Sequence, residues 1–364
     1  MNLSWTLSVY LSRRFFTIVA LTFSLFLALI FMIDLVELMR RGSERETVSF
    51  GLLAGMALLD LPRVGGTTLP FAVLFGGMAA FMRLNRSQEL VVVRASGISI
   101  WQFLVPSLVV AFLIGVFVVT IYNPVSATFA ARYEQLDFKY IKGRSSLLAL
   151  SKNGLWLRQA DPNGQSVIHA LRVNEQTLKL DDVTIFLYSL DNEYQGRIDA
   201  RSAMLRQGYW DLTDAWTTPT VGQPVFHQTY KQATTLTQSQ VEESFANPNT
   251  ISFWDLPHFI QTAEAAGFSA RRYRIHFYEI LATPLLLCTM VLVAAVFSLR
   301  VSRLGGLIQL VVGGVFSGFL VFFLGDLSVA MGISGFLPPF LSAWAPSIVV
   351  MFLGLAVLFH LEDG

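Results

Sequence analysis

Six long apolar runs constrain this chain more than any other feature of its sequence. The first run, Phe15–Ile33, holds 19 consecutive uncharged residues, and a helix of that length crosses the ~30 Å hydrocarbon core of a membrane. No small-residue cleavage site follows this run, so we expect a retained anchor helix and not a cleaved signal peptide. The other five runs are Val64–Met82, a stretch within Ala95–Ala131, Ile280–Leu299, Leu304–Gly325 and roughly Phe340–Phe359.

Between the third and fourth runs the pattern changes to short apolar or aromatic segments divided by Asp, Asn and Gly. Alternation with a period of two, as in Val183, Ile185 and Leu187, indicates antiparallel strands. We therefore predict a membrane α-helical protein with six transmembrane helices, three plus three, and an inserted all-β, jelly-roll-like domain. The predicted boundaries are 1–144 for helices one to three, 145–262 for the β domain and 263–364 for helices four to six.

The composition of the chain excludes several classes of function. The chain is 54% hydrophobic and 14% charged, and its formal net charge is +1, so it lacks the basic field that gathers nucleic acid. The single cysteine, Cys288, cannot form an intrachain disulfide. The sequence contains no GxxxxGK(S/T), HExxH or GxSxG motif, and its five histidines show no metal spacing. We therefore expect no catalytic residues, no metal site, no cofactor and no nucleic-acid partner.

The arginines of the short loops predict the orientation in the membrane. With a cytoplasmic N-terminus, seven of these arginines lie inside and four outside, and an excess of inner arginines is the usual pattern. Three helices before the β domain then place this domain on the outer side. Both termini are expected on the inner side.

The segment Asn85–Gly97, between the second and third runs, is a candidate coupling element. Apolar Leu90 and Val93 together with charged Glu89 and Arg94 indicate a short amphipathic helix. A stiff helix tied closely to two transmembrane helices can pass the movement of a soluble partner into the membrane. The same pattern also fits an interfacial helix that only anchors a loop, and periodicity alone leaves both possibilities open.

Local signals predict where this helix begins and ends. Asn85 or Ser87 is expected as its N-cap, and Gly97 as its left-handed stop. Ser99 and Gln102 form an S-x-x-Q capping box. We expect this box to open the third transmembrane helix.

The segment QELVVVRASG resembles the E-L-x-x-x-x-A-S-G stretch of the LptF/LptG permease family, the membrane subunits of a lipopolysaccharide-export ABC transporter. The resemblance extends over nearly the whole chain, through YLSRRFF, IDLVELMRRG, the Pro62-Arg63 pair, GLWLR and ATPL. It implies a permease that extracts lipopolysaccharide from the bacterial inner membrane and passes it to a periplasmic jelly-roll bridge. The implied energy source is ATP hydrolysis in a separate subunit.

The resemblance also implies a set of partners and a location. The partners are an LptF-like permease, an LptB ATPase dimer, LptC, the periplasmic LptA bridge and membrane lipids. The β domain is expected in the periplasm and both termini in the cytoplasm. The alternatives are the LptF paralogue itself, a non-transporting membrane scaffold and, third, a membrane-bound acyl or glycosyl transferase.

Candidate coupling residues follow from the same resemblance. In the family, the helix matched by Glu89–Gly97 docks in a groove of the LptB ATPase. Glu89 is then expected to make a polar contact at the helix start, while Leu90 and Val93 pack in the groove. Arg94 stands at a position that varies among relatives, and Gly97 ends the helix.

The end of the first helix carries the candidate residues for lipopolysaccharide. Asp34, Glu37, Arg40 and Arg41 share one helix face, at offsets of 0, 3, 6 and 7. Arginine forks suit phosphates, so Arg40, Arg41 and Arg63 are expected to bind those of lipid A. The alternative is that they reach the anionic head groups of ordinary lipids. Relatives carry a lysine at the position of Asp34, and an acid there is expected to pair with a basic residue of the partner subunit.

Overall fold

The computed structural model describes residues 5–42, 49–89, 92, 95, 97–142, 148–151, 154–161, 164–174, 179–189, 193–234, 247–265, 269–301 and 307–363. The chain divides into two units, and each is described by itself. The membrane unit comprises Met1–Ile141, Pro248–Trp254 and Tyr273–Gly364, and the β unit comprises Lys142–Asn247 and Asp255–Arg272.

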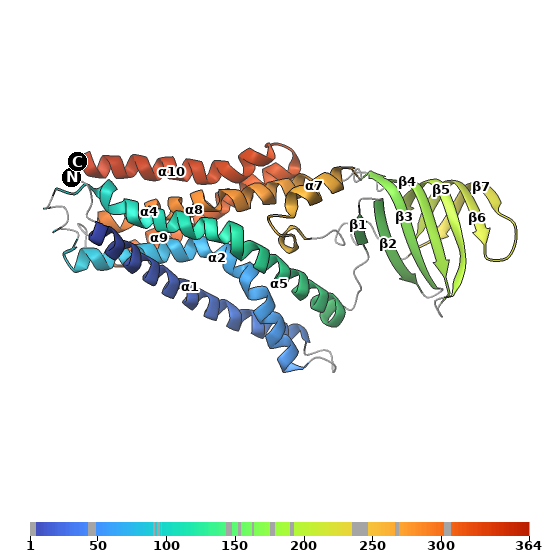
Figure 1. Cartoon of the computed structure of the whole chain (residues 1–364), viewed down its shortest axis with the longest axis horizontal. Coiled ribbons are helices and arrows are strands. Elements are labelled where there is room, and N and C mark those ends of the chain that lie inside the picture. Colours follow the sequence, from blue (N-terminus) through green and yellow to red (C-terminus); the bar gives the residue numbers. More distant parts are fainter. Residues whose placement is uncertain are drawn as a thin grey trace. The chain divides into compact units, whose positions relative to one another are not determined.

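Six helices of the described residues are long and apolar enough to cross a membrane, which confirms the predicted three-plus-three arrangement (Figure 1). The beginning of the first helix, the end of the second, the start of the third and the end of the sixth lie at one end of the membrane unit. The helices exceed the apolar runs, because hydropathy measures the length of chain in lipid and helices continue beyond it. They are α1 (Trp5–Gly42), α2 (Phe50–Arg86), a composite helix beginning with α4 (Ile100–Phe117), α8 (Arg271–Val301), α9 (Leu307–Ser334) and α10 (Pro339–Asp363).

The third helix runs far past the thickness of a bilayer, as its long uncharged stretch predicted. After α4 it continues through the π-helical segment η1 (Val118–Tyr122), α5 (Asn123–Leu136) and the π-helical segment η2 (Asp137–Lys142). Pro124 lacks an N–H and offers no donor to the carbonyl of Thr120 four residues earlier. The indole Nε1 of Trp254 donates to this carbonyl at 3.2 Å. The hydroxyl of Tyr122 donates to the Pro62 carbonyl of α2 at 2.7 Å, which joins the irregular segment to its neighbour.

Glycines let the helices of the membrane unit approach closely. A Cβ on Gly76 of α2 would lie 2.8 Å from the Cα of Val19 in α1, and one on Gly115 of α4 would clash with the Cα of Pro284 in α8. Side-chain atoms cannot come so close to a backbone, so both contacts require glycine. Three glycines of α9 also face side chains of this chain, with Gly313 against Phe297, Gly314 against Met78 and Gly318 against Leu74.

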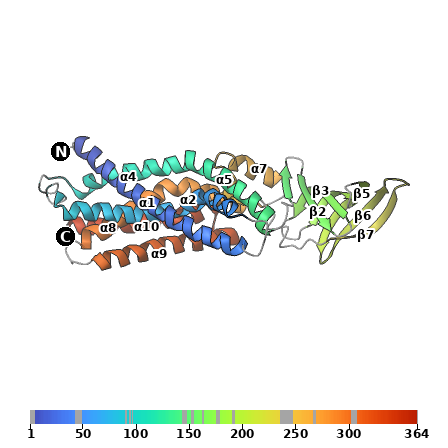
Figure 2. The same cartoon turned by 90° about the horizontal axis from the view of Figure 1, so that it is seen from below.

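Two helices leave much of their apolar surface uncovered. On α1, a stripe that includes Leu11, Phe15 and Val19 is buried in the core of the membrane unit. Other faces of α1 and α9 keep large apolar side chains exposed, such as Leu21 at 71% and Phe316 at 65%. In Figure 2, α9 lies on the side of the membrane unit opposite α4. Such faces suit contact with lipid or with another membrane chain.

The β unit contains a seven-stranded antiparallel sheet whose strands follow the order of the sequence. One row of buried side chains crosses four strands, from Leu157 through Ile168 and Ile185 to Ile198. The predicted inserted all-β domain is therefore confirmed, and its single sheet is a strongly twisted meander (Figure 1). Its strands are β1 (Leu148–Ser151), β2 (Gly154–Asp161), β3 (Gly164–Asn174), β4 (Lys179–Tyr188), β5 (Tyr194–Arg206), β6 (Tyr209–Pro219) and β7 (Val225–Ala233), and the helix α7 (Leu256–Ala265) also belongs to this unit.

A crease crosses β4, β5 and β6 where the alternation of buried side chains changes phase. At the crease, buried residues stand three positions apart on each strand instead of two. Asp182 of β4 and Asp214 of β6 have left-handed backbones, with φ of 54° and 53°, and aspartate tolerates that conformation better than most residues. Strict alternation therefore cannot describe these strands along their whole length. The buried pairs are Leu180 and Val183, Ala200 and Ala203, and Leu212 and Ala215.

Candidate functional site

Two groups of polar side chains in the membrane unit contain most of the residues singled out by the sequence. They lie at opposite ends of α1. The linker cluster, where α1 begins and α2 ends, consists of Tyr10, Arg14, Ser87 and Glu89. The helix-end cluster, where α1 ends and α2 begins, consists of Asp34, Glu37, Arg40, Arg41, Asp60 and Arg63.

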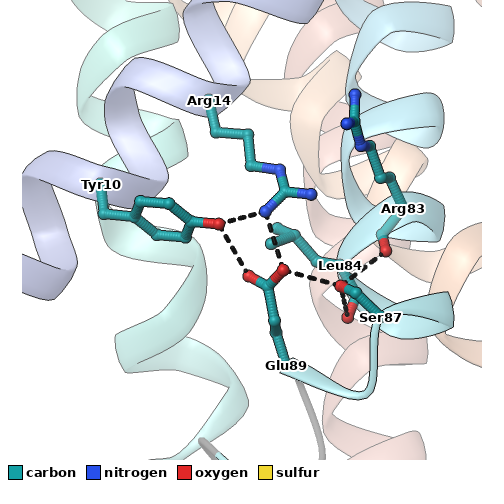
Figure 3. Close-up of polar contacts among 6 residues, drawn as sticks. All are labelled: Tyr10, Arg14, Arg83, Leu84, Ser87 and Glu89. Carbon is teal, nitrogen blue, oxygen red and sulfur yellow. Dashed lines mark hydrogen bonds and ion pairs between the residues drawn. The ribbon is translucent and has the colours of Figure 1, made fainter.

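The chain turns sharply between α2 and the linker. Ser87 is the C-cap of α2, and its N–H donates to the Arg83 carbonyl at 3.0 Å. The next residue, Gln88, has a left-handed backbone with φ of 60°, which is uncommon for a residue other than glycine. Helix resumes at Glu89, and the N–H of Val92 donates to the Gln88 carbonyl at 3.2 Å. The turn brings Glu89 towards α1 (Figure 3).

The ends of the linker are only partly as predicted. Neither expected N-cap begins the linker helix, because α2 continues past the apolar run, so that Asn85 lies inside it and Ser87 caps its C-terminal end. Gly97 has the predicted left-handed backbone, with φ of 82°. The capping box is confirmed, because Ser99 and Gln102 exchange hydrogen bonds between side chain and backbone at 3.3 Å. The candidate coupling residues Leu90, Val93 and Arg94 lie outside the described residues.

Glu89 is held by three donors, two of them from α1 (Figure 3). Arg14 Nη1 donates to its Oε1 at 2.8 Å, Ser87 Oγ donates to the same oxygen at 2.8 Å, and Tyr10 Oη donates to Oε2 at 3.1 Å. The Arg14 nitrogen also donates to the Tyr10 hydroxyl. The Arg14 side chain is 19% exposed and that of Glu89 34%. Partial burial by itself raises the pKa of Glu89, but the hydrogen bonds it accepts outweigh burial and lower this pKa below its usual value.

The helix-end cluster pairs each arginine with an acid on its own helix. Glu37 accepts from Arg40 at 2.9 Å and from Arg41 at 2.8 Å. Asp60 accepts two hydrogen bonds from Arg63, of 2.6 and 2.7 Å. The trio on α1 therefore carries a formal net charge of +1, whereas the pair on α2 is neutral.

Asp34 faces the pair on α2 from α1. Its carboxylate interacts electrostatically with Asp60 and Arg63, and its Oδ2 atom is buried with no hydrogen-bond partner in the part of the chain that the structure describes. With three acids and three arginines, the helix-end cluster is formally neutral as a whole. A phosphate that binds here must therefore share an arginine with a carboxylate or displace that carboxylate.

Sequence reasoning missed several members of the two clusters. Asp60 stands three positions before Arg63, and this spacing was a readable signal for an ion pair on one helix. Tyr10 and Arg14 are 79 and 75 positions from Glu89. No local spacing connects them, so only the fold shows the contact.

A cavity of about 350 Å³ adjoins the helix-end cluster at Arg63. Its walls come from α2, the third helix, α8, α9 and α10, and its polar lining includes His276, Glu279 and Asp326. Asp326 of α9 was not singled out in the sequence. Ionisable residues within membrane spans usually face protein or an aqueous cavity, and Asp326 does so.

Six membrane-crossing helices, with a β domain inserted in the sequence between the third and the fourth, define a multi-pass membrane protein with charged clusters at both ends of its first helix. The sequence model of the family described as "Lipopolysaccharide export system permease LptF/LptG" matches residues 9–360, so the chain belongs to this family. The predicted resemblance is thereby confirmed. The chain is similar to the lipopolysaccharide export system permease protein LptG of Escherichia coli strain K12 and to that of Escherichia coli O6:H1, each 24% identical over 96% of both chains. It is therefore a permease component of lipopolysaccharide export and a multi-pass inner-membrane protein.

Proposed function

We propose that this chain is the LptG-type permease subunit of the exporter and that ATP hydrolysis in a separate LptB dimer drives it. Family membership supports the transport role. The end of helix one, MIDLVELMRR, and the similarity to LptG of Escherichia coli support this paralogue. An LptF-like permease forms the other half of the membrane complex, and LptC with LptA receives the cargo.

The linker between α2 and α4 is the observation that carries this proposal. It begins with left-handed Gln88 and ends with left-handed Gly97, and the capping box at Ser99 starts α4 directly afterwards. A short element with defined turns at both ends moves together with the helices that flank it. A partner bound to the linker therefore acts on α2 and α4. The proposed ATPase-coupling residues are Glu89, Leu90, Val93, Arg94 and Gly97.

The proposed lipopolysaccharide contacts lie in the helix-end cluster. Arg40 and Arg41 are 76% and 51% exposed and share the carboxylate of Glu37, so a phosphate can take one guanidinium while Glu37 keeps the other. Arginine and phosphate form short charge-assisted hydrogen bonds. Arg63 is a weaker candidate, because Asp60 already neutralises it. Asp34 completes the proposed set by pairing with a basic residue of the partner subunit.

The proposed orientation places the linker and both termini in the cytoplasm and the β domain in the periplasm. The excess of arginines on the linker side supports this orientation. This orientation requires the start of α1, the end of α2 and the end of α10 to lie at the same end of the membrane unit, and they do (Figure 1). The proposed domain division is 1–144, 145–262 and 263–364.

Reconstitution with LptB and an LptF-like permease tests the proposal. We expect a stable complex that hydrolyses ATP and releases lipopolysaccharide from proteoliposomes to LptA. The double variant Leu90→Asp, Val93→Asp should no longer co-purify with LptB, whereas Val221→Asp, at a 90% exposed position of the β unit, should behave like the wild type. A chain that folds but binds neither LptB nor lipopolysaccharide contradicts the proposal and favours a non-transporting scaffold.

A further inference from the structure

We propose that Arg14 is a positioning residue for transport, because its ion pair with Glu89 ties the linker to α1 and passes movement of the linker along α1 to the helix-end cluster. This inference rests on the proposed function, in which an ATPase moves the linker. It adds to the proposed coupling role of Glu89 a second contact, made by the same carboxylate within the chain. In the structure, the carboxylate serves a contact within the chain.

The Glu89 carboxylate is already occupied. Arg14 and Ser87 donate to one oxygen at 2.8 Å each, and Tyr10 donates to the other at 3.1 Å. A carboxylate offers about four acceptor sites, so most of the capacity of Glu89 is already used within the chain. Tyr10 and Arg14 stand one helical turn apart, so they reach Glu89 from the same face of α1 (Figure 3). Glu89 is thus attached to α1 through these two residues and to the end of α2 through Ser87.

The backbone before Glu89 is shaped for the same contact. Residues with a side chain seldom adopt the left-handed conformation of Gln88. Such a conformation persists only where the surrounding structure enforces it. At this position it ends α2 and directs the next residue towards α1 (Figure 3). This backbone feature is independent of the side-chain hydrogen bonds and points to the same tie.

α1 is the stiffest route from the linker to the helix-end cluster. It contains no proline, and its glycine is the final residue, Gly42. By contrast, α2 contains Pro62 and Pro70, and the third helix contains Pro106 and π-helical segments. Prolines and π-helical segments are the places where helices bend. From residue 14 to residue 40, α1 spans about 39 Å of continuous helix, at ~1.5 Å per residue.

α1 is also held less firmly by its own chain than α2 is. In the most apolar window of α1, 6% of the residues are buried, against 61% for the corresponding window of α2. Elements with few buried contacts move at a smaller free-energy cost than core elements. A force applied at Arg14 therefore shifts α1 more readily than a force of the same size shifts α2.

Charge reversal in the complex with LptB and the LptF-like permease tests the tie. Arg14→Glu and Glu89→Arg each place like charges across the contact, and the double variant restores an ion pair of opposite polarity. We expect Arg14→Glu to bind LptB and hydrolyse ATP like the wild type but to release about tenfold less lipopolysaccharide per ATP. Glu89→Arg should show at least the same loss, because it breaks the same ion pair at a proposed coupling residue. The double variant should recover most of this loss. The matched control is Arg13→Glu, which reverses the same charge at the exposed neighbouring position and should change nothing.

Two results would overturn the inference. The first is an unchanged yield of lipopolysaccharide per ATP in Arg14→Glu. The second is loss of LptB from Glu89→Arg while Arg14→Glu has no effect, because this outcome assigns Glu89 to direct contact with the ATPase.

A measurement without partners separates this inference from the proposed function. Hydrogen exchange of the chain in detergent reports on the N–H of Val92, which donates to the Gln88 carbonyl. We expect faster exchange in Arg14→Gln than in the wild type, and no change in Arg13→Gln. Equal rates in all three chains contradict the tie. A wild-type chain that shows the tie by exchange but neither binds LptB nor releases lipopolysaccharide contradicts the proposed function alone.

Discussion

The linker cluster and the helix-end cluster use similar side chains in opposite ways. At the linker, Glu89 is paired with residues of α1 that stand 75 and 79 positions earlier in the chain. At the helix ends, the described ion pairs join residues three or four positions apart on one helix. A pair between elements determines where those elements lie, whereas a pair within one helix can break without moving the helix. The linker cluster is therefore suited to fixing the linker against α1. The helix-end cluster is suited to releasing an arginine from its carboxylate so that the arginine can bind another anion.

We expect the largest effect from breaking the ion pair between Asp60 and Arg63. This pair joins residues of one helix, but unlike the other helix-end pairs it is buried on the Asp60 side. Asp60 is 6% exposed, and Asp60→Ala leaves the partly buried Arg63 without its carboxylate. We expect the free energy of unfolding to fall by about 2 kcal/mol, measured by thermal unfolding in detergent. The double variant Asp60→Leu, Arg63→Met should recover most of this loss. If the single variant is as stable as the wild type, burial does not distinguish this pair from the exposed pairs.

We expect the next largest effect from removing the two exposed arginines at the end of α1, which are proposed to exchange Glu37 for a phosphate. The double variant Arg40→Ala, Arg41→Ala should weaken lipopolysaccharide binding about tenfold, because it removes charge-assisted donors to phosphate. Its stability should stay near that of the wild type. Binding is measured by cross-linking to lipopolysaccharide in proteoliposomes, with Arg13→Ala at the other end of α1 as the control. Undiminished cross-linking would show that these arginines serve other lipids.

A double-mutant cycle between Arg14 and Glu89 measures how firmly the linker is held. We expect a coupling energy of about 1 kcal/mol from the unfolding of Arg14→Ala, Glu89→Ala and the double variant. The pKa of Glu89 is lowered in the folded chain, so this stabilisation is present above the ordinary carboxyl pKa of about 4.3 and is lost as the pH falls through the lower folded value. A coupling energy near zero at neutral pH would show that the Arg14–Glu89 pair does not hold the linker against α1.

The smallest effect is expected for Glu37. Glu37→Gln should lower the free energy of unfolding only slightly, as is usual for exposed pairs three or four positions apart. It also removes the acid that competes with phosphate for Arg40 and Arg41, so cross-linking to lipopolysaccharide should increase. Weaker cross-linking would show that Glu37 orients the arginines for cargo instead of competing with it.

Features that depend on local composition or spacing were predictable from the sequence. The six spans followed from apolar runs that match the thickness of a membrane. The capping box needs only Ser99 and Gln102 at the right distance, and the left-handed end of the linker needs only Gly97. The N-cap expected at Asn85 or Ser87 was wrong, because hydropathy does not show how far α2 extends beyond the lipid.

Features that depend on distant parts of the chain were beyond the sequence. The contact between Glu89 and Arg14 was missed, because no local pattern shows that Arg14 lies opposite Glu89. The crease in the sheet was missed for a related reason: Asp182 and Asp214 look like turn residues, yet they lie inside strands with left-handed backbones. The roles of Leu90, Val93 and Arg94 stay predictions.

The hydrogen bond from Trp254 to the Thr120 carbonyl makes two positions depend on each other over evolutionary time. While residue 124 is proline, the position four residues on has no N–H to offer that carbonyl, and loss of the indole removes the donor that Trp254 supplies. Once residue 124 is any other amino acid, its own N–H can take over. A lineage can therefore lose the proline first and the tryptophan afterwards without strain, whereas the reverse order passes through a less stable ancestor.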